Sequence, residues 1–156
     1  MPTENAPATE ITIRQAAPSD LDRLAPLFDA YRQFYRQPGD LEGAKRFLLD
    51  RLRYNQSIIF IAFQAGEGVG FTQLYPSFSS GAMAQILILN DLFVAPNARK
   101  RGVGGVLLER AAEYARQIGA LRLVLSTEAE NLIAQSLYQK HGWKRDAVFW
   151  TYILNI

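Results

Sequence analysis

An apolar strand, a short basic loop and a glycine-rich helix start follow one another in the sequence Asn90-Asp91-Leu92-Phe93-Val94-Ala95-Pro96-Asn97-Ala98-Arg99-Lys100-Arg101-Gly102-Val103-Gly104-Gly105. Each glycine costs a helix about 1 kcal/mol relative to alanine, so another role has to offset that cost. The first turn of a helix has unpaired N–H groups with positive partial charge, and a phosphate is their natural occupant. The alternative interpretation is a tight helix start whose glycines permit close packing on the sheet.

Spacing separates this loop from other phosphate-binding motifs. A dinucleotide-binding fingerprint needs a glycine three places after Gly104, where the chain has Leu107. A nucleoside-triphosphate loop needs Gly-Lys-Ser or Gly-Lys-Thr before the helix, and the chain contains neither triplet. Hydride transfer and phosphoryl transfer are therefore disfavoured.

The pattern on either side of this loop predicts a mixed α/β (α+β) fold. Apolar residues recur at three- and four-residue steps in the predicted helices, and they alternate or run continuously in the predicted strands. Strands are predicted at 11–14, 57–63, 69–75, 86–94, 121–126 and 148–153, and helices at 19–34, 40–52, 102–119 and 133–141. The order β-α-α-β-β-β-α-β-α-β predicts a central sheet with helices on both faces, and one right-handed crossover over 86–126.

Length and composition bound the class of protein. The 156 residues suit a single domain, predicted at 11–156 after a disordered polar tail at 1–10. No apolar run approaches the ~18 residues that span a bilayer, and residues 1–10 lack the basic and apolar regions of a secretory signal. The chain has no cysteine, which excludes disulfides, thiolate metal sites and a cysteine nucleophile. We expect a cytoplasmic protein with no membrane partner.

Charge and histidine content exclude further classes. The formal net charge of +2 is too small for the broad positive field of a nucleic-acid-binding protein, so no nucleic-acid partner is expected. With His141 as the single histidine, no transition-metal site is expected either. The chain has no Gly-x-Ser-x-Gly motif to act with His141, which disfavours a serine hydrolase. We expect His141 to stabilise the C-terminus of a helix.

At these residues the chain resembles the GNAT superfamily of acyl-CoA-dependent N-acetyltransferases. The signature of that superfamily, Arg/Gln-x-x-Gly-x-Gly/Ala, matches residues 99–104. The likeness continues through 90–94, Asn131, Tyr138 and His141-Gly142-Trp143, so that it covers residues 85–152. Within the superfamily, Leu-Asn-Asp-Leu-Phe-Val followed by Gly-x-Gly-Gly is most similar to the histone and polyamine acetyltransferase-like branch.

The resemblance implies a mostly antiparallel sheet, acetyl-CoA as co-substrate and no metal. It implies that backbone groups bind the CoA pyrophosphate at Arg101, Gly102, Val103, Gly104 and Gly105, with Arg99 and Lys100 adding positive charge beside them. It also implies that a bulged, splayed strand end holds the pantetheine arm by main-chain hydrogen bonds, at Leu92, Phe93 and Val94.

Tyr138 is the candidate general acid. Direct transfer needs a proton to reach the departing CoA thiolate, and a phenol with a pKa near 10 suits that step. Tyr138 lies seven positions after Asn131, two helical turns on, so both side chains are expected on one face. The resemblance gives the same role to a tyrosine here, while the alternative is packing beside Ala134 and Leu137. Asn131 is expected to cap the helix, and its matching family position also contacts the cofactor.

Asp91 is the second candidate catalytic residue. A carboxylate within an apolar strand is unusual, because desolvation raises its pKa unless a partner compensates. Such a group can receive the amine's proton through water, or bind an ammonium substrate. The alternative is that Asp91 caps the strand end or pairs with a neighbouring arginine, and relatives also use an ordered-water chain as the base.

The acceptor is left open by the sequence. The two N-terminal helices and the segment 34–37 are expected to wall its site, as in the family. Aromatic residues that can line it, or equally form core, are Tyr31, Tyr35, Tyr75 and Phe78. A small-molecule amine, a polyamine-like cation and the side chain of a lysine-containing substrate all fit. The aromatic end Phe149-Trp150-Thr151-Tyr152-Ile153 favours burial against a second subunit, which is the hypothesis of a homodimer.

These observations predict an N-acetyltransferase that works by direct attack in a ternary complex. Cysteine is absent and the serine elbow is missing, so no nucleophile for a covalent acyl-enzyme stands out. The alternative function is a catalytically inactive acyl-CoA-binding domain that serves as a sensor or scaffold.

Overall fold

The computed structural model of the protein describes residues 10–156, in two units that meet in sequence at Ser126 and Thr127. The first unit holds the sheet and three helices, and the second holds one helix and the C-terminal segment. The predicted tail at 1–10 lies, apart from Glu10, outside the described residues. The prediction of one domain over 11–156 stays a prediction.

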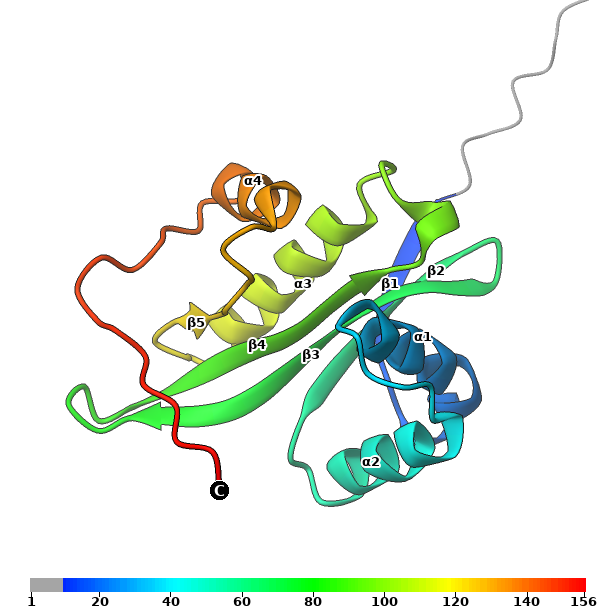
Figure 1. The fold of residues 1–156 in the computed structure, drawn as a ribbon, viewed down its shortest axis with the longest axis horizontal. Helices are drawn as coiled ribbons and strands as arrows, with labels where there is room; N and C mark the ends of the chain where they lie inside the picture. Colours follow the sequence, from blue (N-terminus) through cyan, green and yellow to red (C-terminus); the bar gives the residue numbers. More distant parts are fainter. Residues whose placement is uncertain (1–9) are drawn as a thin grey trace, which may run out of the picture. The chain divides into compact units, whose positions relative to one another are not determined.

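Five strands of the first unit form one sheet in the order β1-β2-β3-β4-β5 (Figure 1). Their bounds are Ile11–Gln15, Ile58–Gln64, Glu67–Ser79, Ala84–Val94 and Leu123–Val124. The pairs β1–β2, β2–β3 and β3–β4 are antiparallel, while β4 and β5 are parallel and are joined through a helix. The predicted mixed, mostly antiparallel sheet is therefore confirmed, together with the crossover between β4 and β5.

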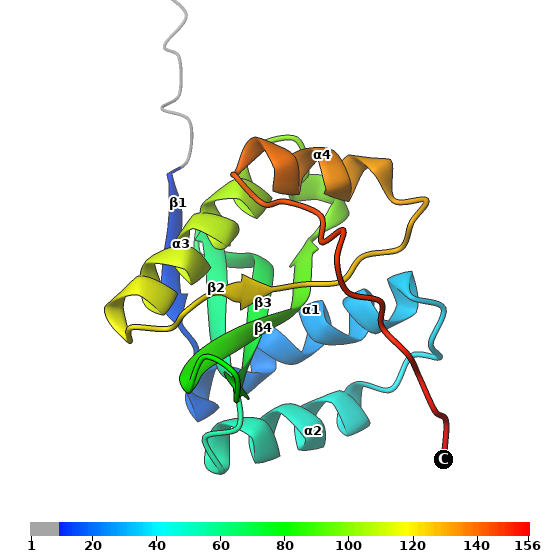
Figure 2. The same cartoon turned by 90° about the vertical axis from the view of Figure 1, so that its left-hand side faces the viewer.

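Helices cover both faces of this sheet, as predicted. Figure 1 and Figure 2 show α1 (Leu21–Phe34) and α2 (Leu41–Arg53) on one side of the strands and α3 (Val103–Gln117) on the other. Short 3-10 turns at Pro18–Asp20 and Pro96–Ala98 precede α1 and α3. Asp40 caps α2 as expected, because its Oδ1 accepts a hydrogen bond of 2.8 Å from the Gly43 N–H.

Period-two alternation along the strands separates the two cores. Phe71 on β3 packs edge-on against Phe28 and Tyr31 of α1. Its neighbour Gly70 faces α3, where a Cβ would lie 2.7 Å from the Phe93 carbonyl oxygen and 3.3 Å from Val103 and Leu107 side-chain carbons. The larger core, between the sheet and α1–α2, contains Leu24, Leu27, Phe28, Ala44, Leu48, Ile59, Ile61, Phe63, Phe71 and Phe93.

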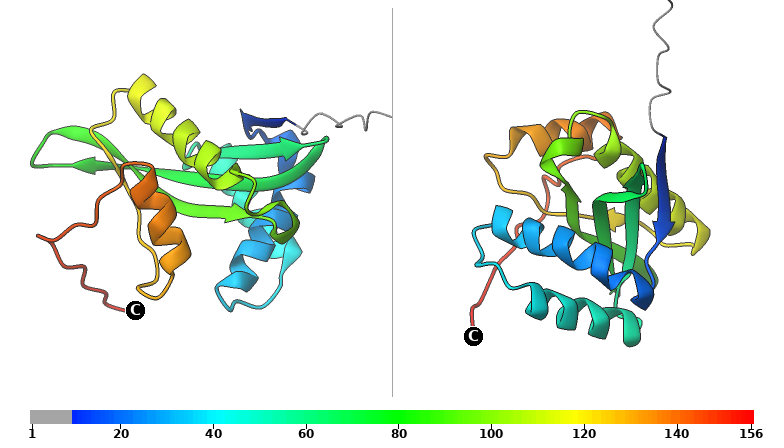
Figure 3. Two further views of the ribbon diagram at one scale, coloured as in Figure 1. Left: turned by 90° about the horizontal axis from the view of Figure 1, so that it is seen from above. Right: turned by 90° about the vertical axis from the view of Figure 1, so that its right-hand side faces the viewer.

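β3 and β4 are longer than predicted and continue as a two-stranded arm beyond the end of β2 (Figure 3). Residues 76–79, which lie between the strands predicted at 69–75 and 86–94, pair with β4 from Leu87 to Ala84. The pairing of β2 with β3 ends at the pair Ile58–Leu74, so one edge of β3 is free at Pro76. A proline, which lacks an N–H donor, is tolerated at such an edge.

The C-terminal end of the predicted sheet is where expectation and structure differ. The strand predicted at 121–126 is reduced to Leu123–Val124, and the final strand predicted at 148–153 is absent within residues 10–156. Residues 148–153 have the apolar content of a strand, but a strand exists only when a neighbouring strand takes its backbone hydrogen bonds. That prediction was wrong for the single chain.

The second unit is built around α4 (Leu132–Lys140). Asn131 caps its N-terminus, because its Oδ1 accepts a hydrogen bond of 3.1 Å from the Ala134 N–H. The helix ends at Lys140, with His141 as its C-cap residue and Gly142 following at φ +86°, so the predicted position of His141 at the helix end is confirmed. Within residues 10–156, no helix is long and apolar enough to cross a membrane.

Candidate active site

A β-bulge at Asn90 sets the direction of the side chains around Asp91. Gln73 lies opposite Asp91, whereas the next residue, Leu74, lies opposite Leu89, so Asn90 is the extra residue on β4. The bulge places Asp91 on the same face as Phe93, toward α1, and turns Leu89 to the other face. A polar side chain is thereby directed into the larger core.

Asp91 is 2% exposed and is held by neutral donors. Asn90 Nδ2 donates to its Oδ1 at 2.7 Å, and Gln73 Nε2 makes a short hydrogen bond to its Oδ2. Burial raises the pKa of this carboxyl above its ordinary value, while the hydrogen bonds from Asn90, Gln73 and Tyr31 oppose that rise. The predicted desolvation of Asp91 is confirmed, and these donors stand where the alternative interpretation had an arginine.

Gln73 is a partner that sequence reasoning missed. It is fully buried, and its Oε1 is without a hydrogen-bond partner among the described residues. The available signal was a second polar residue inside an apolar strand, in Phe71-Thr72-Gln73-Leu74. Its amide can turn to offer either a donor or an acceptor, so this site tolerates Asp91 in both protonation states.

Two of the three candidate acceptor-site tyrosines lie near Asp91, and the third packs against one of them. Tyr31 on α1 donates a hydrogen bond of 3.3 Å to the Asn90 carbonyl oxygen, and burial followed by the charge of Asp91 raises its pKa. Tyr35 packs edge-on against Tyr31 with ring centroids 5.1 Å apart. Burial and then the Asp91 charge raise the pKa of Tyr75 to about 12. Helix α1, which was expected to wall the acceptor site, thus supplies Tyr31 beside the Asp91 carboxylate.

Phe78 does not belong to this group. It is 74% exposed on the β3–β4 arm, opposite Gln85. At about 3.3 Å per residue, it lies roughly 16 Å along β3 from Gln73. In the sequence the four residues were grouped because all are aromatic. Only the strand register shows that Phe78 lies apart from the others.

β4 has a free edge where the resemblance implied a splayed strand end. β5 pairs with β4 only at Leu87 and Ile88, so β5 leaves the edge of β4 uncovered from Leu89 to Val94. Residues 92–94 remain paired with β3 on the other side. The bulge itself lies at Asn90, before the three residues for which it was expected.

Arg99 folds back on the end of β4 rather than extending from the loop. Its Nε donates a hydrogen bond of 3.0 Å to the Val94 carbonyl oxygen, and its guanidinium lies 5.7 Å from the Phe93 ring centroid and 5.8 Å from that of Phe34. Lys100 is exposed with φ +63°, a conformation that non-glycine residues seldom adopt. The loop is therefore bonded to the end of β4 at Arg99 and exposed to solvent at Lys100.

The start of α3 presents unpaired donors. Within residues 10–156, no acceptor meets the backbone N–H groups of residues 100–105, and no side chain caps the helix. Gly102 has φ +83° and open space where a side chain would stand. Gly105 is buried whereas Gly104 is half-buried, so close packing explains Gly105, and the positive φ explains the glycine at position 102.

The remaining predicted residues lie in the second unit. Tyr138 is half-buried on α4, and its ring centroid is 6.2 Å from that of Trp143. The Tyr138 carbonyl oxygen accepts hydrogen bonds from the N–H groups of His141 and Trp143 at the helix end. Asn131 uses its side chain as the helix cap, and its second expected role, a cofactor contact, stays a prediction.

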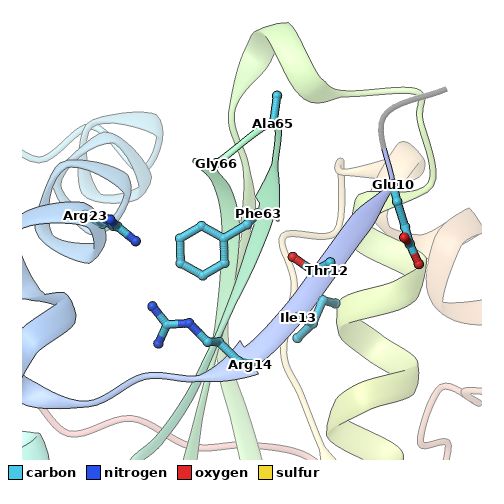
Figure 4. A pocket seen from close by; sticks show the side chains of 8 residues that line it. All are labelled: Glu10, Thr12, Ile13, Arg14, Arg23, Phe63, Ala65 and Gly66. Atoms are coloured by element: carbon cyan, nitrogen blue, oxygen red, sulfur yellow. The ribbon is translucent and has the colours of Figure 1, made fainter. Parts of the chain in front are cut away.

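A separate cavity of about 380 Å³ lies between β1, α1 and the β2–β3 turn (Figure 4). Arg14 and Arg23 lie over the Phe63 ring there, and Arg14 also holds Asp20 at 2.6 Å. Its lining includes no residue of β4 or α3. The charged side chains of this cavity pack against Phe63 and against one another, and the cavity is distinct from the Asp91 site.

In the described part of the chain, no cluster of histidine or carboxylate side chains is arranged to hold a metal ion.

Comparison with known proteins identifies the family. The sequence model of the acetyltransferase (GNAT) family matches residues 24–143. The chain belongs to the GNAT acetyltransferase family. The match spans α1 through α4 and includes the bulge, the basic loop and the start of α3.

Individual relatives agree with this assignment. An uncharacterized N-acetyltransferase of Bacillus subtilis, YhfO, is 53% identical over 94% of this chain and 98% of its own length. The D-amino-acid N-acetyltransferase HPA3 of Saccharomyces cerevisiae is 26% identical over 90% of this chain and 89% of its own. A crystal structure of a probable acetyltransferase superposes with a TM-score of 0.88 at 42% identity, covering 93% and 97% of the two chains. Likeness to the histone and polyamine branch stays a prediction.

Proposed function

We propose that the protein transfers an acetyl group from acetyl-CoA to a primary amine by direct attack in a ternary complex. The observation that supports this most is the pairing, on one strand–loop–helix segment, of a buried carboxylate with an open helix start. The amine nitrogen attacks the thioester carbonyl, the C–S bond breaks, and the departing thiolate takes a proton. The residues of the site divide these tasks.

The start of α3 is suited to the pyrophosphate of the cofactor. The unpaired N–H groups of residues 100–105 and the helix dipole favour an anion there. Gly102 leaves space for close approach, and the exposed Lys100 and Arg101 add positive charge. The β4 edge that β5 leaves uncovered, at 92–94, is where a pantetheine arm can make main-chain hydrogen bonds.

Asp91 is suited to the amine. Burial raises its pKa, which makes it a better proton acceptor at neutral pH than an exposed carboxylate. It can attract the ammonium form of the acceptor and take up its proton, through water, so that the neutral nitrogen attacks. Tyr31 orients the site from α1, since its hydroxyl reaches both the Asn90 carbonyl oxygen and the carboxylate and can donate its one proton to either.

Tyr138 is proposed as the acid that protonates the thiolate. A phenol matches the proton affinity of a leaving thiolate better than a carboxylate does. It stands on α4, inside the segment that matches the family. Asn131 holds the N-terminus of the same helix and thereby fixes its first turn.

The acceptor proposed is a small-molecule amine. A single buried carboxylate with tyrosines around it recognises one compact ammonium group more readily than a long chain of charges. The name of the yeast relative, a D-amino-acid N-acetyltransferase, is consistent with this class of acceptor. A polyamine and a lysine-containing peptide are the alternatives to be tested beside it.

Turnover of acetyl-CoA against amino acids, small amines, polyamines and basic peptides tests the proposal. Release of CoA thiol, followed with a thiol reagent, is readable without background because the chain has no cysteine. We expect turnover with at least one small amine. If acetyl-CoA binds but no amine supports turnover, the protein is the inactive sensor or scaffold. If only lysine peptides react, the acceptor assignment fails while the transfer chemistry stands.

A further inference from the structure

A row of polar side chains, here called the polar row, continues from Asp91 across the sheet on the face that α1 and α2 cover. Gln73 lies opposite Asp91, and Tyr75 is two residues further along β3, so both side chains of β3 share this face. Ser57 directly precedes β2, whose first residue pairs with Leu74, so Ser57 comes opposite Tyr75. The polar row therefore runs from β4 over β3 to the start of β2.

Two atoms of the polar row are buried without a partner. Gln73 is fully buried and Ser57 is 7% exposed. Within residues 10–156, neither Gln73 Oε1 nor Ser57 Oγ has a hydrogen-bond partner. Buried polar groups are nearly always paired, because leaving one unpaired costs its full desolvation penalty. Two such atoms, one on either side of Tyr75, indicate that a polar ligand completes the row.

Arg51 of α2 stands at the far end of the polar row. Its guanidinium carbon lies 4.5 Å from the Phe47 ring centroid, and its Nε donates a hydrogen bond of 2.8 Å to Gln56 Oε1. Gln56 immediately precedes Ser57 in sequence, so this bond holds the guanidinium beside the start of β2. Among the described residues, the two terminal nitrogens of Arg51 meet no acceptor. They remain available to an anion.

The two ends of the polar row differ in charge and in hydrogen-bonding character. The Asp91 carboxylate and Gln73 Oε1 accept hydrogen bonds, and this end suits an ammonium group. The Arg51 guanidinium and the Ser57 hydroxyl donate them, and a planar guanidinium matches a carboxylate with two parallel bonds. Burial and the Asp91 charge raise the pKa of Tyr75, whereas the Arg51 charge opposes the rise, so both charges act on the phenol between them.

We propose that the acceptor is an amino acid whose carboxylate binds Arg51 and Ser57 while its amino group faces Asp91. The proposal rests on the proposed function and narrows its class of small-molecule amines. A polyamine would bring a second positive charge toward the guanidinium, which is unfavourable. A lysine side chain within a peptide carries no carboxylate close to its amine. Arg51 is thus a specificity-determining residue.

Matched pairs of acceptors test this assignment. Acetyl transfer is measured with α-amino acids, with ω-amino acids of increasing length, and with the carboxamide of each. Arg51→Gln is expected to raise the KM for the best amino acid about 10–100-fold and to change the KM for its amide little. Wild type and variant are compared within each acceptor, so the different basicity of acid and amide cancels.

Further variants separate recognition from packing. Arg53→Gln is the matched control, because Arg53 is exposed on the same helix, and it is expected to change neither KM. Arg51→Lys keeps the charge and loses the planar fork, so its KM for the amino acid should lie between those of wild type and Arg51→Gln. An equal rise for acid and amide would mean that Arg51 only supports the fold of the site, which overturns the proposal.

The remaining outcomes separate this inference from acetyl transfer itself. Turnover confined to amines without a carboxylate overturns the amino-acid assignment and leaves the proposed function standing. If no amine is acetylated, the proposed function fails, and calorimetric titration of the same amino acids into the protein with CoA then decides the inference. Binding that Arg51→Gln weakens and Arg53→Gln does not supports it. Absence of amino-acid binding to the unaltered protein overturns it.

Discussion

Asp91 and the start of α3 are near neighbours in sequence, yet their environments are opposite. Asp91 is buried, and every polar contact around it comes from the protein, through Asn90, Gln73 and Tyr31. At Gly102 a side chain would meet open space, and no described acceptor meets the N–H groups of the first turn of α3. Under the proposed function, the acceptor side is organised before any ligand binds, whereas the cofactor side keeps its hydrogen bonds for the ligand. The first arrangement tunes a proton acceptor, and the second provides affinity.

The largest effect on activity is expected from substitution of the buried Asp91. Asp91→Asn should lower kcat/KM by about 10²–10⁴-fold, the usual contribution of a general base. Wild-type activity should rise with pH through the raised pKa of Asp91, and the variant should lose that rise. Folding should persist because the Gln73 amide can turn its unpaired Oε1 toward the new donor. Steady-state kinetics over pH measures this, with Asp22→Asn, whose side chain is 91% exposed, as control. A variant as active as wild type would assign the proton to a water chain.

Tyr138 on α4 is the proposed general acid, and its hydroxyl can be tested separately. Tyr138→Phe removes the phenolic proton and keeps the ring, so kcat should fall on the order of 10²-fold while the KM for acetyl-CoA changes little. An exposed tyrosine provides the control as Tyr54→Phe. Unchanged kcat with the substituted enzyme would show that Tyr138 packs beside its helix neighbours and that another donor protonates the thiolate.

A substitution at the start of α3 should change the affinity for CoA rather than the stability of the protein. Gly104→Val places a branched side chain on the first turn of α3 and should weaken CoA binding by about 10–100-fold, through loss of roughly 1.4–2.8 kcal/mol of binding free energy. The melting temperature should change about as much as in Ala112→Val, a half-buried position further along α3. Calorimetric titration with CoA and thermal melts measure the two quantities. Equal affinity in both variants would remove the phosphate site from this helix start.

A smaller effect concerns how the ionisation of Asp91 changes the stability of the protein. The folded-state pKa of Asp91 lies above its unfolded value, so the group favours folding most at low pH, and this contribution is lost as pH rises through the folded pKa. Asp91→Asn removes the buried charge, so its melting temperature relative to wild type should be higher at pH 8 than at pH 4. The gain is about 2–4 °C for each kcal/mol relieved. A difference that stays constant with pH would mean that the Asp91 carboxyl has the same pKa in the folded and unfolded states.

Much of this site was predictable from local sequence because its signals are local. The cost of glycines in a helix pointed to the start of α3, and a carboxylate in an apolar strand pointed to Asp91. Gln73 was missed because its meaning depends on strand register, which places it opposite Asp91. Phe78 was grouped with the tyrosines for the same reason, since only register separates it from them.

Sequence alone determined the order of the elements, the basic glycine loop and the family likeness, because periodicity, capping residues and loop composition act over a few neighbouring positions. Tertiary structure decided the bulge at Asn90, the burial of Asp91 among neutral donors, the retraction of Arg99 onto Phe93 and the absence of a final strand in the single chain. These depend on which segment supplies the neighbouring hydrogen bonds and van der Waals contacts. Those partners lie far away in the chain.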